Sequence, residues 1–278
     1  MTRPPDVSVI LVHYRDVEET RRCLASLERA CDGLSYETFV VDNSPSQELE
    51  RGAMLFAPPV SVVSMMRNVG LARATNCALR RSVGRYCLCL NPDVLAKPGS
   101  IRSLVEFADV HPRAGIVAAR LENRDGTLQL SCRRFYTLEH VLARRTPLRV
   151  LLPSRSINRD HLMEDCDHHV PANVDWILGS CMLVRAAAVS DVGPMDERFF
   201  LYFEDVDWCY RMHERGWDVV YYPEVSMVHH HKRDSAAPGF SRQKLAHVAS
   251  FIAFHRKHGW HLLWRRASAA PSWGHRDR

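Results

Sequence analysis

Three acidic residues stand close together near position 205, among aromatic side chains. Glu204, Asp205 and Asp207 follow the aromatic segment 199–203 and surround Val206. A carboxylate fixed in such surroundings can act as a general base that takes a proton from an attacking hydroxyl, and Asp205 is the candidate for that role. Acids in the first turn of a helix also stabilise the helix dipole, so a purely structural role stays open.

A further candidate carboxylate, Asp93, follows the apolar segment 86–90. Pro92 lacks a backbone donor and restricts the residue before it, so a strand through this segment must end there. Carboxylate oxygens bind hard divalent cations, which in turn grip a diphosphate. Asn-Pro-Asp is also common in turns, and this alternative stays open.

His229 ends the apolar segment 225–228 and begins a run of three histidines. A neutral imidazole can coordinate a metal ion beside a carboxylate, which makes His229 a candidate metal ligand. A separate zinc site is conceivable at Cys166, His168 and His169, but no second ligand pair with suitable spacing accompanies them.

The spacing of apolar residues predicts the frame that holds these side chains. Strands are expected at residues 7–14, 38–42, 60–65 and 86–90, and helices at 18–31 and 71–83. This alternation predicts an α/β fold with a mostly parallel sheet that helices cover on both faces. Ligands bind beyond the carboxyl ends of such strands, where Asp42 and Asp93 stand.

The second half of the chain has a weaker pattern. Residues 133–173 are rich in Arg, His and Pro and predict loops and short helices. Strands are expected at 174–184, 219–222 and 225–229, and helices at 204–215 and 243–258.

Composition places the chain among globular proteins. It has 278 residues, of which 46% are hydrophobic and 25% charged, enough for one large α/β domain with a buried core. No apolar run is long enough to span a membrane, and the first one is too short for a signal peptide. The nine cysteines are odd in number and contain no CxxC pair, which argues against a disulfide framework. We therefore expect a cytoplasmic protein.

Positive charge is concentrated at the C-terminal end. Residues 241–278 contain eight Lys or Arg and one acid, whereas the whole chain carries only +5. A general nucleic-acid binder would place such charge on its main domain, so we expect no nucleic-acid partner. Basic residues interleaved with Phe251, Trp260 and Trp264 suit the anionic inner face of the plasma membrane. A helix packed on the main domain is the alternative, and both stay open.

Short motifs recur along roughly residues 7–232. They are VSVILVHY (7–14), VVDNS (40–44), NVGLA (68–72) with Asn76, LNPD (90–93), WILGSCMLV (176–184), DERFF (196–200), EDVD (204–207) and His229. Each motif is short, but their order and spacing are specific. Taken in order, they resemble the family 2 glycosyltransferases and, among them, the bacterial rhamnosyltransferase-like branch.

This resemblance implies a GT-A fold. A nucleotide-sugar-binding half at about residues 1–125 would join an acceptor-binding, catalytic half at 126–240, followed by a basic amphipathic helix and tail at 241–278. The activity it implies is transfer of a sugar, with inversion at the anomeric carbon, from a nucleotide-diphosphate sugar to a hydroxyl of a glycan or lipid-linked acceptor. Such a reaction belongs to the assembly of cell-surface polysaccharide, and rhamnose is the sugar that the branch suggests.

The resemblance also assigns roles to residues. Asp42 would hold the nucleoside, Asp205 would be the catalytic base, and Asp93 with His229 would bind a divalent metal ion, Mn²⁺ or Mg²⁺. The full set expected at the nucleotide sugar is Asp42, Asn43, Asn68, Gly70, Arg73, Asn91 and Asp93. The set expected at the acceptor is Trp176, Gly179, Ser180, Glu204 and Asp207, with Trp176 as either a sugar-stacking wall or a core residue.

Two positions depart from the family pattern. Asn91 replaces the first acid of the metal-binding triplet, so fewer carboxylates are available to the ion. Arg73 and Ala74 replace a glycine pair, and Arg73 either reaches the diphosphate or narrows the site. Two other functions stay open: a non-catalytic nucleotide-sugar-binding or assembly protein, and a sugar nucleotidyltransferase. The latter would carry a glycine-rich loop after the first strand, which the segment 13–16 does not resemble.

Overall fold

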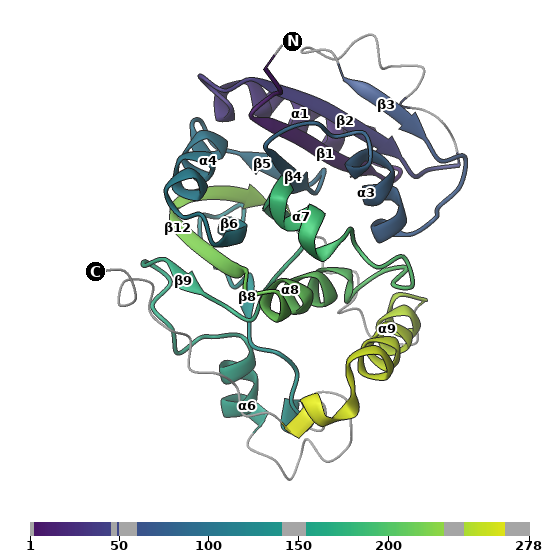
Figure 1. Ribbon diagram of the computed structural model, residues 1–278, viewed down its shortest axis with the longest axis vertical. Coiled ribbons are helices and arrows are strands. Elements are labelled where there is room, and N and C mark those ends of the chain that lie inside the picture. The colour runs from purple at the N-terminus through teal and green to yellow at the C-terminus, as the bar shows by residue number, and fades with distance from the viewer. Residues whose placement is uncertain (1–2, 46–48, 50–59, 141–153, 231–241, 265–278) are drawn as a thin grey trace.

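The computed structural model describes residues 3–45, 49, 60–140, 154–230 and 242–264. Their main element is a 10-stranded sheet (Figure 1). Its N-terminal half consists of four parallel strands in the order β3-β2-β1-β4. These strands are β1 (Val7–His13), β2 (Tyr36–Asp42), β3 (Ser61–Ser64) and β4 (Tyr86–Leu90).

The sheet continues with strands of mixed direction in the order β11-β6-β12-β5. β11 runs antiparallel to both β4 and β6, while β12 runs parallel to β6. The bounds are β5 (Val94–Ala96), β6 (Ala114–Glu122), β11 (Cys181–Arg185) and β12 (Asp218–His229). Short strands at the edges are β7 (Leu128–Gln129) and β9 (Ala172–Asn173), and β8 (Cys132–Arg133) pairs with β10 (Trp176–Ile177) in a separate ribbon.

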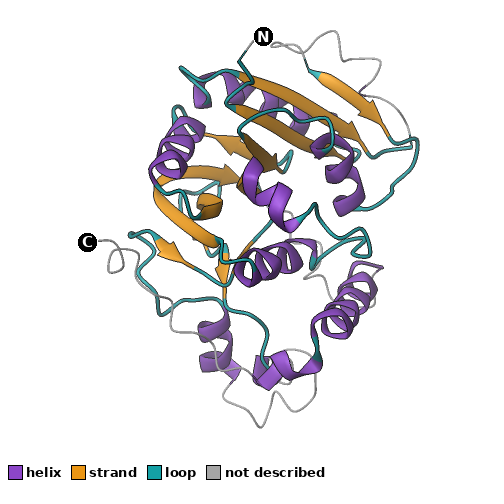
Figure 2. Cartoon of the chain, in the orientation of Figure 1, coloured by secondary structure: helices purple, strands orange, loops and turns teal. Residues whose placement is uncertain are grey.

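Helices cover both faces of this sheet (Figure 2). One face carries α1 (Val17–Ala30) and α4 (Ser100–Val110). The other carries α3 (Leu71–Leu79), α7 (Ala186–Val192) and α8 (Glu204–Glu214). Two further helices, α6 (Ser154–His161) and α9 (Arg242–His258), lie on the far side of α8 from the N-terminal strands in Figure 1, and a short 3-10 helix (Trp260–Trp264) follows α9.

Each face of the sheet has its own hydrophobic core. Successive side chains of a strand point to opposite faces, so Val9 and Leu11 pack with α1 and α4 while Ile10 packs with α3. The continuous apolar run in β1 follows from burial on both sides. The α/β fold with a mostly parallel N-terminal sheet is therefore confirmed.

The predicted elements differ from the structure mainly in the second half. The strand expected at 174–184 is two strands, because β10 pairs with β8 in the separate ribbon while β11 joins the main sheet, and residues 178–180 connect them. The two strands expected at 219–222 and 225–229 are one strand, β12, with an irregularity around Pro223, which cannot donate to the ladder. Residues 133–173 contain the short helix α6, as expected, and also the short strand β9, which was not expected. Residues 141–153 lie outside the described residues.

The C-terminal helix is packed on the main domain. Phe254 of α9 is 3% exposed and its ring lies 5.6 Å from that of Phe203, at the start of α8. Within the residues that the structure describes, no helix has both the length and the apolar character that a membrane span requires. The expected tail beyond residue 264 lies outside those residues.

Candidate active site

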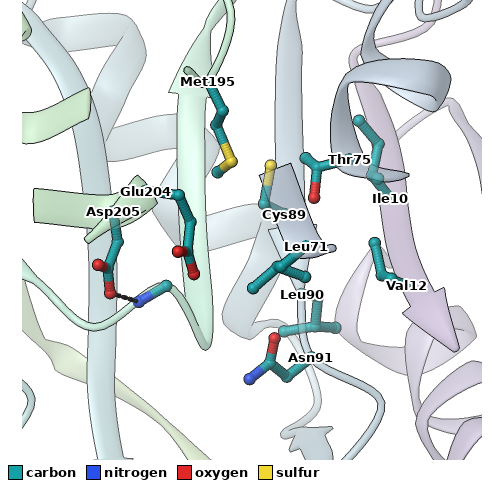
Figure 3. Close-up of a pocket in the computed structure, with 11 residues that line it drawn as sticks. Ile10, Val12, Leu71, Thr75, Cys89, Leu90, Asn91, Met195, Glu204 and Asp205 are labelled. Carbon is teal, nitrogen blue, oxygen red and sulfur yellow. Dashed lines mark hydrogen bonds between the residues drawn. The ribbon is translucent and has the colours of Figure 1, made fainter. Parts of the chain in front are cut away.

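A pocket lies where α8 meets the carboxyl ends of β1 and β4 (Figure 3). This is the edge of the sheet at which ligands of α/β proteins bind. Figure 3 shows the carboxyl groups of Glu204 and Asp205 together on one wall, with Leu71 and Asn91 opposite. The pocket is lined by Ile10, Val12, Leu71, Thr75, Cys89, Leu90, Asn91, Gly179, Met195, Glu204 and Asp205.

The start of α8 presents these two carboxyl groups in a strained turn. Tyr202 and Phe203 both have positive φ, 67° and 70°, which non-glycine residues rarely adopt. Such strain persists only where the surroundings enforce it. Here Phe203 is 2% exposed and packs between the rings of Tyr136, Phe251 and Phe254, so the core and α9 together hold the turn.

Asp205 is held by two backbone amides. Gly179 donates its N–H to Oδ2 at 3.0 Å, and Val206 donates to Oδ1 at 2.8 Å. Burial raises the pKa of Asp205, and these two hydrogen bonds oppose the rise because they stabilise the ionised form. Asp205 is therefore a fixed carboxylate at the pocket wall.

Glu204 lies beside it in a different environment. It is 4% exposed, and its Oε2 has no hydrogen-bond partner among the described residues. Burial, followed by the charge of Asp205, raises the pKa of Glu204 well above its usual value. Two backbone amides thus favour the ionised form of Asp205, whereas Oε2 of Glu204 has no such donor among the described residues.

Asp93 and His229 meet at the same edge of the sheet, outside the lining of the pocket. His229 Nε2 lies 3.3 Å from Asp93 Oδ1, and His229 Nδ1 lies 2.6 Å from Oε1 of Gln129. An amide oxygen only accepts, so Nδ1 carries the hydrogen and Nε2 faces the carboxylate. The backbone N–H of His230 donates to the Asp93 carbonyl and ties β12 to the turn after β4.

This pair fits two positions around a divalent ion. Two ligand atoms about 2.1 Å from one ion, at right angles, are about 3 Å apart, close to the observed separation. The bond to Gln129 resembles the outer hydrogen bond that orients metal-binding histidines. Among the described residues no group of three or more His, Cys, Asp or Glu side chains could hold a metal ion, so any ion here needs further ligands from substrate and water.

The loop before α3 is built by Asn43, Asn68 and Gly70, which the structure brings together. The Asn43 side chain donates to Asn68 Oδ1 at 3.1 Å and accepts the N–H of Val69 at 2.9 Å. The amide of Gly70 donates to Asn68 Oδ1 at 2.9 Å, and the amide of Leu71 donates to the Phe200 carbonyl at 2.9 Å. These contacts join the end of β2 to the segment before α8, and so connect the two halves of the chain.

Asp42 ends β2 and is fully buried. Its Oδ1 accepts the N–H of Ser44 at 2.9 Å, and its Oδ2 has no hydrogen-bond partner among the described residues. It lies next to His13 in the register of β1 and β2 but does not line the pocket. A nucleoside would have to displace neighbouring atoms to reach it.

Comparison with known proteins decides the family. The family model described as glycosyl transferase family 2 matches residues 8–171, more than half of the chain. The chain belongs to glycosyl transferase family 2. A second model, glycosyl transferase family group 2, matches residues 148–274. The protein is accordingly an enzyme, a glycosyltransferase, as the motifs predicted.

Relatives of this glycosyltransferase include rhamnosyltransferases. This chain is 29% identical over 271 residues to the N-acetylglucosaminyl-diphospho-decaprenol L-rhamnosyltransferase of Mycobacterium tuberculosis. The matched region covers 92% of this chain and 86% of the relative. The chain is 24% identical to the rhamnosyltransferase WbbL of Escherichia coli, covering 89% and 92%. The similarity to a rhamnosyltransferase-like branch is therefore confirmed.

A solved structure supports the GT-A fold. The crystal structure of GalNAc-T7 with UDP, GalNAc and Mn²⁺ superposes with a TM-score of 0.65 at 15% identity. The match covers 91% of this chain, which spans about half (48%) of that protein. At this identity the similarity concerns the fold alone.

Two residues expected at the acceptor lie away from the pocket in this glycosyltransferase. Asp207 is fully buried and accepts hydrogen bonds from Arg211, Lys257 and His258 at 2.8, 2.6 and 2.7 Å. Trp176 is 5% exposed in the core and donates to the Arg134 carbonyl at 3.0 Å. Neither lines the pocket, because Asp207 fixes α9 to α8 and Trp176 fills the core.

Two other expected residues lie near the pocket but do not line it. Arg73 is exposed and lies 3.6 Å from Glu197, with its side chain on the outer face of α3. Ser180 is buried, and its carbonyl accepts the N–H of Asn91 at 2.9 Å, which aligns the end of β4 with the start of β11. Both residues shape the surroundings of the lining residues.

The sequence did not reveal several residues of the site. Thr75 and Met195 line the pocket, Gln129 orients His229, and Arg133 lowers the pKa of Asp205 against the larger effect of burial. None of them lies in a motif with recognisable spacing. At the conceivable zinc site, His168 faces Cys132 Sγ at 3.6 Å and the Met163 carbonyl at 2.8 Å.

Proposed function

We propose that this glycosyltransferase moves a sugar, with inversion, from a nucleotide-diphosphate sugar to a hydroxyl of a glycan or lipid-linked acceptor during glycan biosynthesis. The observation that carries the proposal is the fixed Asp205 carboxylate at the wall of a pocket beside the carboxyl ends of β1 and β4. We assign residues 1–125 to the donor, 126–240 to the acceptor and catalysis, and 241–278 to the C-terminal helix and tail.

Asp205 is the base in this reaction. Its two amide donors fix its orientation and stabilise its ionised form against the burial that raises its pKa. The acceptor O–H gives its proton to Asp205 while the acceptor oxygen bonds to the anomeric carbon. The bond from that carbon to the diphosphate oxygen breaks in the same displacement, so the configuration inverts and the nucleoside diphosphate leaves.

Asp93 and His229 are the proposed ligands of a divalent ion, Mn²⁺ or Mg²⁺. When bound, such an ion would neutralise negative charge on the diphosphate. The separation of the two ligand atoms and the support from Gln129 favour this assignment. Asn91 supplies an amide in place of a carboxylate, so one less charge attracts the ion, and we expect modest affinity.

The names of the relatives suggest the substrates. Two are rhamnosyltransferases, and one of them is named for N-acetylglucosaminyl-diphospho-decaprenol, a lipid-linked sugar. We propose rhamnose, from a thymidine diphosphate donor, as the transferred sugar. The apolar side chains of Ile10, Leu71 and Met195 in the pocket suit a sugar that carries a methyl group in place of a hydroxymethyl.

A lipid-linked acceptor would require the enzyme to work at a membrane surface. On α9 the residues Leu245 and Val248 are 59% and 49% exposed, and Trp260 beyond its end is 47% exposed. The inner face of the same helix is packed, so α9 is apolar on both sides. Together with the excess of basic residues in 241–278, the exposed face suits the anionic inner leaflet of the plasma membrane.

Release of nucleoside diphosphate tests the function. The purified chain is incubated with a panel of nucleotide sugars and polyprenyl-diphosphate sugar acceptors, with Mn²⁺, Mg²⁺ or a chelator. We expect metal-dependent turnover of one donor, a loss of about 10²- to 10⁴-fold in kcat for Asp205→Asn, and none for the exposed control Asp32→Asn. The metal-dependent release of nucleoside diphosphate should also be lost in Asp93→Ala.

Other outcomes point to the other functions. Donor binding without turnover in the presence of every acceptor would favour a non-catalytic binding protein. Formation of a nucleotide sugar from a nucleoside triphosphate and a sugar phosphate would favour a nucleotidyltransferase. Absence of binding to any donor would refute sugar transfer by this pocket.

A further inference from the structure

Glu204 is a buried polar group for which the fold provides no complete set of partners. It is 4% exposed and lines the pocket, yet its Oε2 has no hydrogen-bond partner among the described residues. Buried polar atoms in proteins are nearly always satisfied, because an unsatisfied one loses its hydrogen bonds to water. An unpartnered oxygen at the wall of a pocket therefore points to a partner that arrives with the substrate.

The two adjacent carboxyl groups are treated differently by their surroundings. Asp205 receives the N–H groups of Gly179 and Val206, whereas no such donor reaches Glu204 Oε2. Burial and the charge of Asp205 both raise the pKa of Glu204. Two carboxyl groups whose environments separate their pKa values take opposite roles, one as a base and the other as a neutral acid.

The rest of the pocket wall offers few alternative donors. Most of its residues are apolar, among them Ile10, Leu71 and Met195. The proposed function places a sugar ring at this pocket. A hydroxyl of that ring would find the carboxyl group of Glu204 within the pocket.

We propose that Glu204 is a neutral carboxylic acid that donates a hydrogen bond to a hydroxyl of the sugar in the pocket, and so selects and orients that sugar beside Asp205. This inference rests on the proposed function, because it takes the pocket as a sugar site. The proton stays on Glu204 throughout, so the residue binds substrate and takes no part in the proton transfer. Asp205 remains free to act as the base.

Two substitutions of similar shape separate donation from packing. Glu204→Gln keeps an N–H donor and cannot ionise, whereas Glu204→Met has similar length and no donor. We expect Glu204→Gln to retain kcat/KM within about threefold of the wild type. Glu204→Met should lose about 10- to 100-fold in kcat/KM, since it leaves a buried hydroxyl of the sugar without a hydrogen-bond partner. The exposed control Glu28→Met should change neither activity nor melting temperature.

The pH profile gives a second readout. Wild-type activity should fall at alkaline pH as Glu204 ionises, and this limb should be absent in Glu204→Gln. Monodeoxy donors identify the partner hydroxyl: wild type should discriminate against one of them, and the Met variant should not. A purely structural role would alter the melting temperature of both variants and leave this discrimination intact.

A readout independent of turnover keeps the inference separate from the proposed function. Infrared spectroscopy at pH 7 should show a protonated carboxylic acid band that Glu204→Gln lacks, even if no donor is turned over. Absence of that band, or equal losses in the Gln and Met variants at unchanged melting temperature, would overturn the inference. Presence of the band in a protein that binds no nucleotide sugar would overturn the sugar as partner, and with it the proposed function.

Discussion

Substitution of Gly70 by alanine should separate the two loops that bring Leu71 and α8 to the pocket. Gly70 has φ 88° and ψ 165°, a conformation that is essentially restricted to glycine. A Cβ at this position would lie 2.6 Å from the Phe200 carbonyl oxygen, which already accepts the N–H of Leu71. The obstacle is backbone, so a side-chain rotation cannot relieve it.

The magnitude follows from two contributions. The unfavourable backbone conformation costs about 1–3 kcal/mol. Overpacking against the Phe200 carbonyl adds about 1–3 kcal/mol. We therefore expect Gly70→Ala to lower the free energy of unfolding by about 4 kcal/mol.

Gly99→Ala is the matched control. Gly99 also has a positive φ, 72°, but a Cβ there would meet nothing within 4 Å, so only a conformational cost of about 1–2 kcal/mol applies. Urea denaturation of both variants measures the difference, with the midpoint compared at equal slope. Nucleoside diphosphate release below the unfolding transition should fall for Gly70→Ala only. Equal destabilisation by the two substitutions would refute the role of the Gly70–Phe200 contact.

Three further predictions concern α9. His255 is 1% exposed with no partner for either ring nitrogen among the described residues, and burial lowers its pKa from 6.5 to about 4. The unfolded chain binds that proton first, so stability should fall by about 3 kcal/mol between pH 6.5 and 4. Urea denaturation at pH 7 and 4.5 should show a smaller fall in the free energy of unfolding for His255→Phe than for the wild type. An equal fall in the two proteins would contradict the role assigned to His255. Lys257→Met should lower the free energy of unfolding by about 2 kcal/mol, because the fully buried Asp207 carboxylate loses one of its cations. The exposed control Arg256→Met should lower it by less than about 0.5 kcal/mol. Equal shifts in melting temperature for the two variants would contradict a stabilising role of the Lys257–Asp207 ion pair. Co-sedimentation with phosphatidylglycerol vesicles should be lost in Leu245→Ser/Val248→Ser, and retention equal to wild type would exclude this face as the membrane contact.

The sequence determined the N-terminal sheet because its signals there are local. The segment predicted at 86–90 is β4 (Tyr86–Leu90) without change, and it ends where Pro92 removes a backbone donor. By contrast, β6 (Ala114–Glu122) was not predicted, since its three alanines, one glycine and two charged residues make its strand propensity low. β6 lies between β11 and β12, and burial in the middle of the sheet outweighs that propensity.

The sequence also determined which residue types were available for chemistry, but contacts between distant segments decided which of them meet. Asp93 and His229 were expected to act together, and the structure brings them to 3.3 Å. Gln129 completes that contact without any motif to mark it. Long-range contacts of this kind depend on the order of strands in the sheet, which local patterns do not specify.

Asp205 and Asp207 show the division most clearly. Two residues apart on one helix, their side chains point about 200° apart around its axis, so the sequence alone fixes that they face opposite sides of α8. It does not fix which side holds the pocket. The packing of α9 decides that, because Lys257 and His258 enclose Asp207 and leave Asp205 toward the sheet.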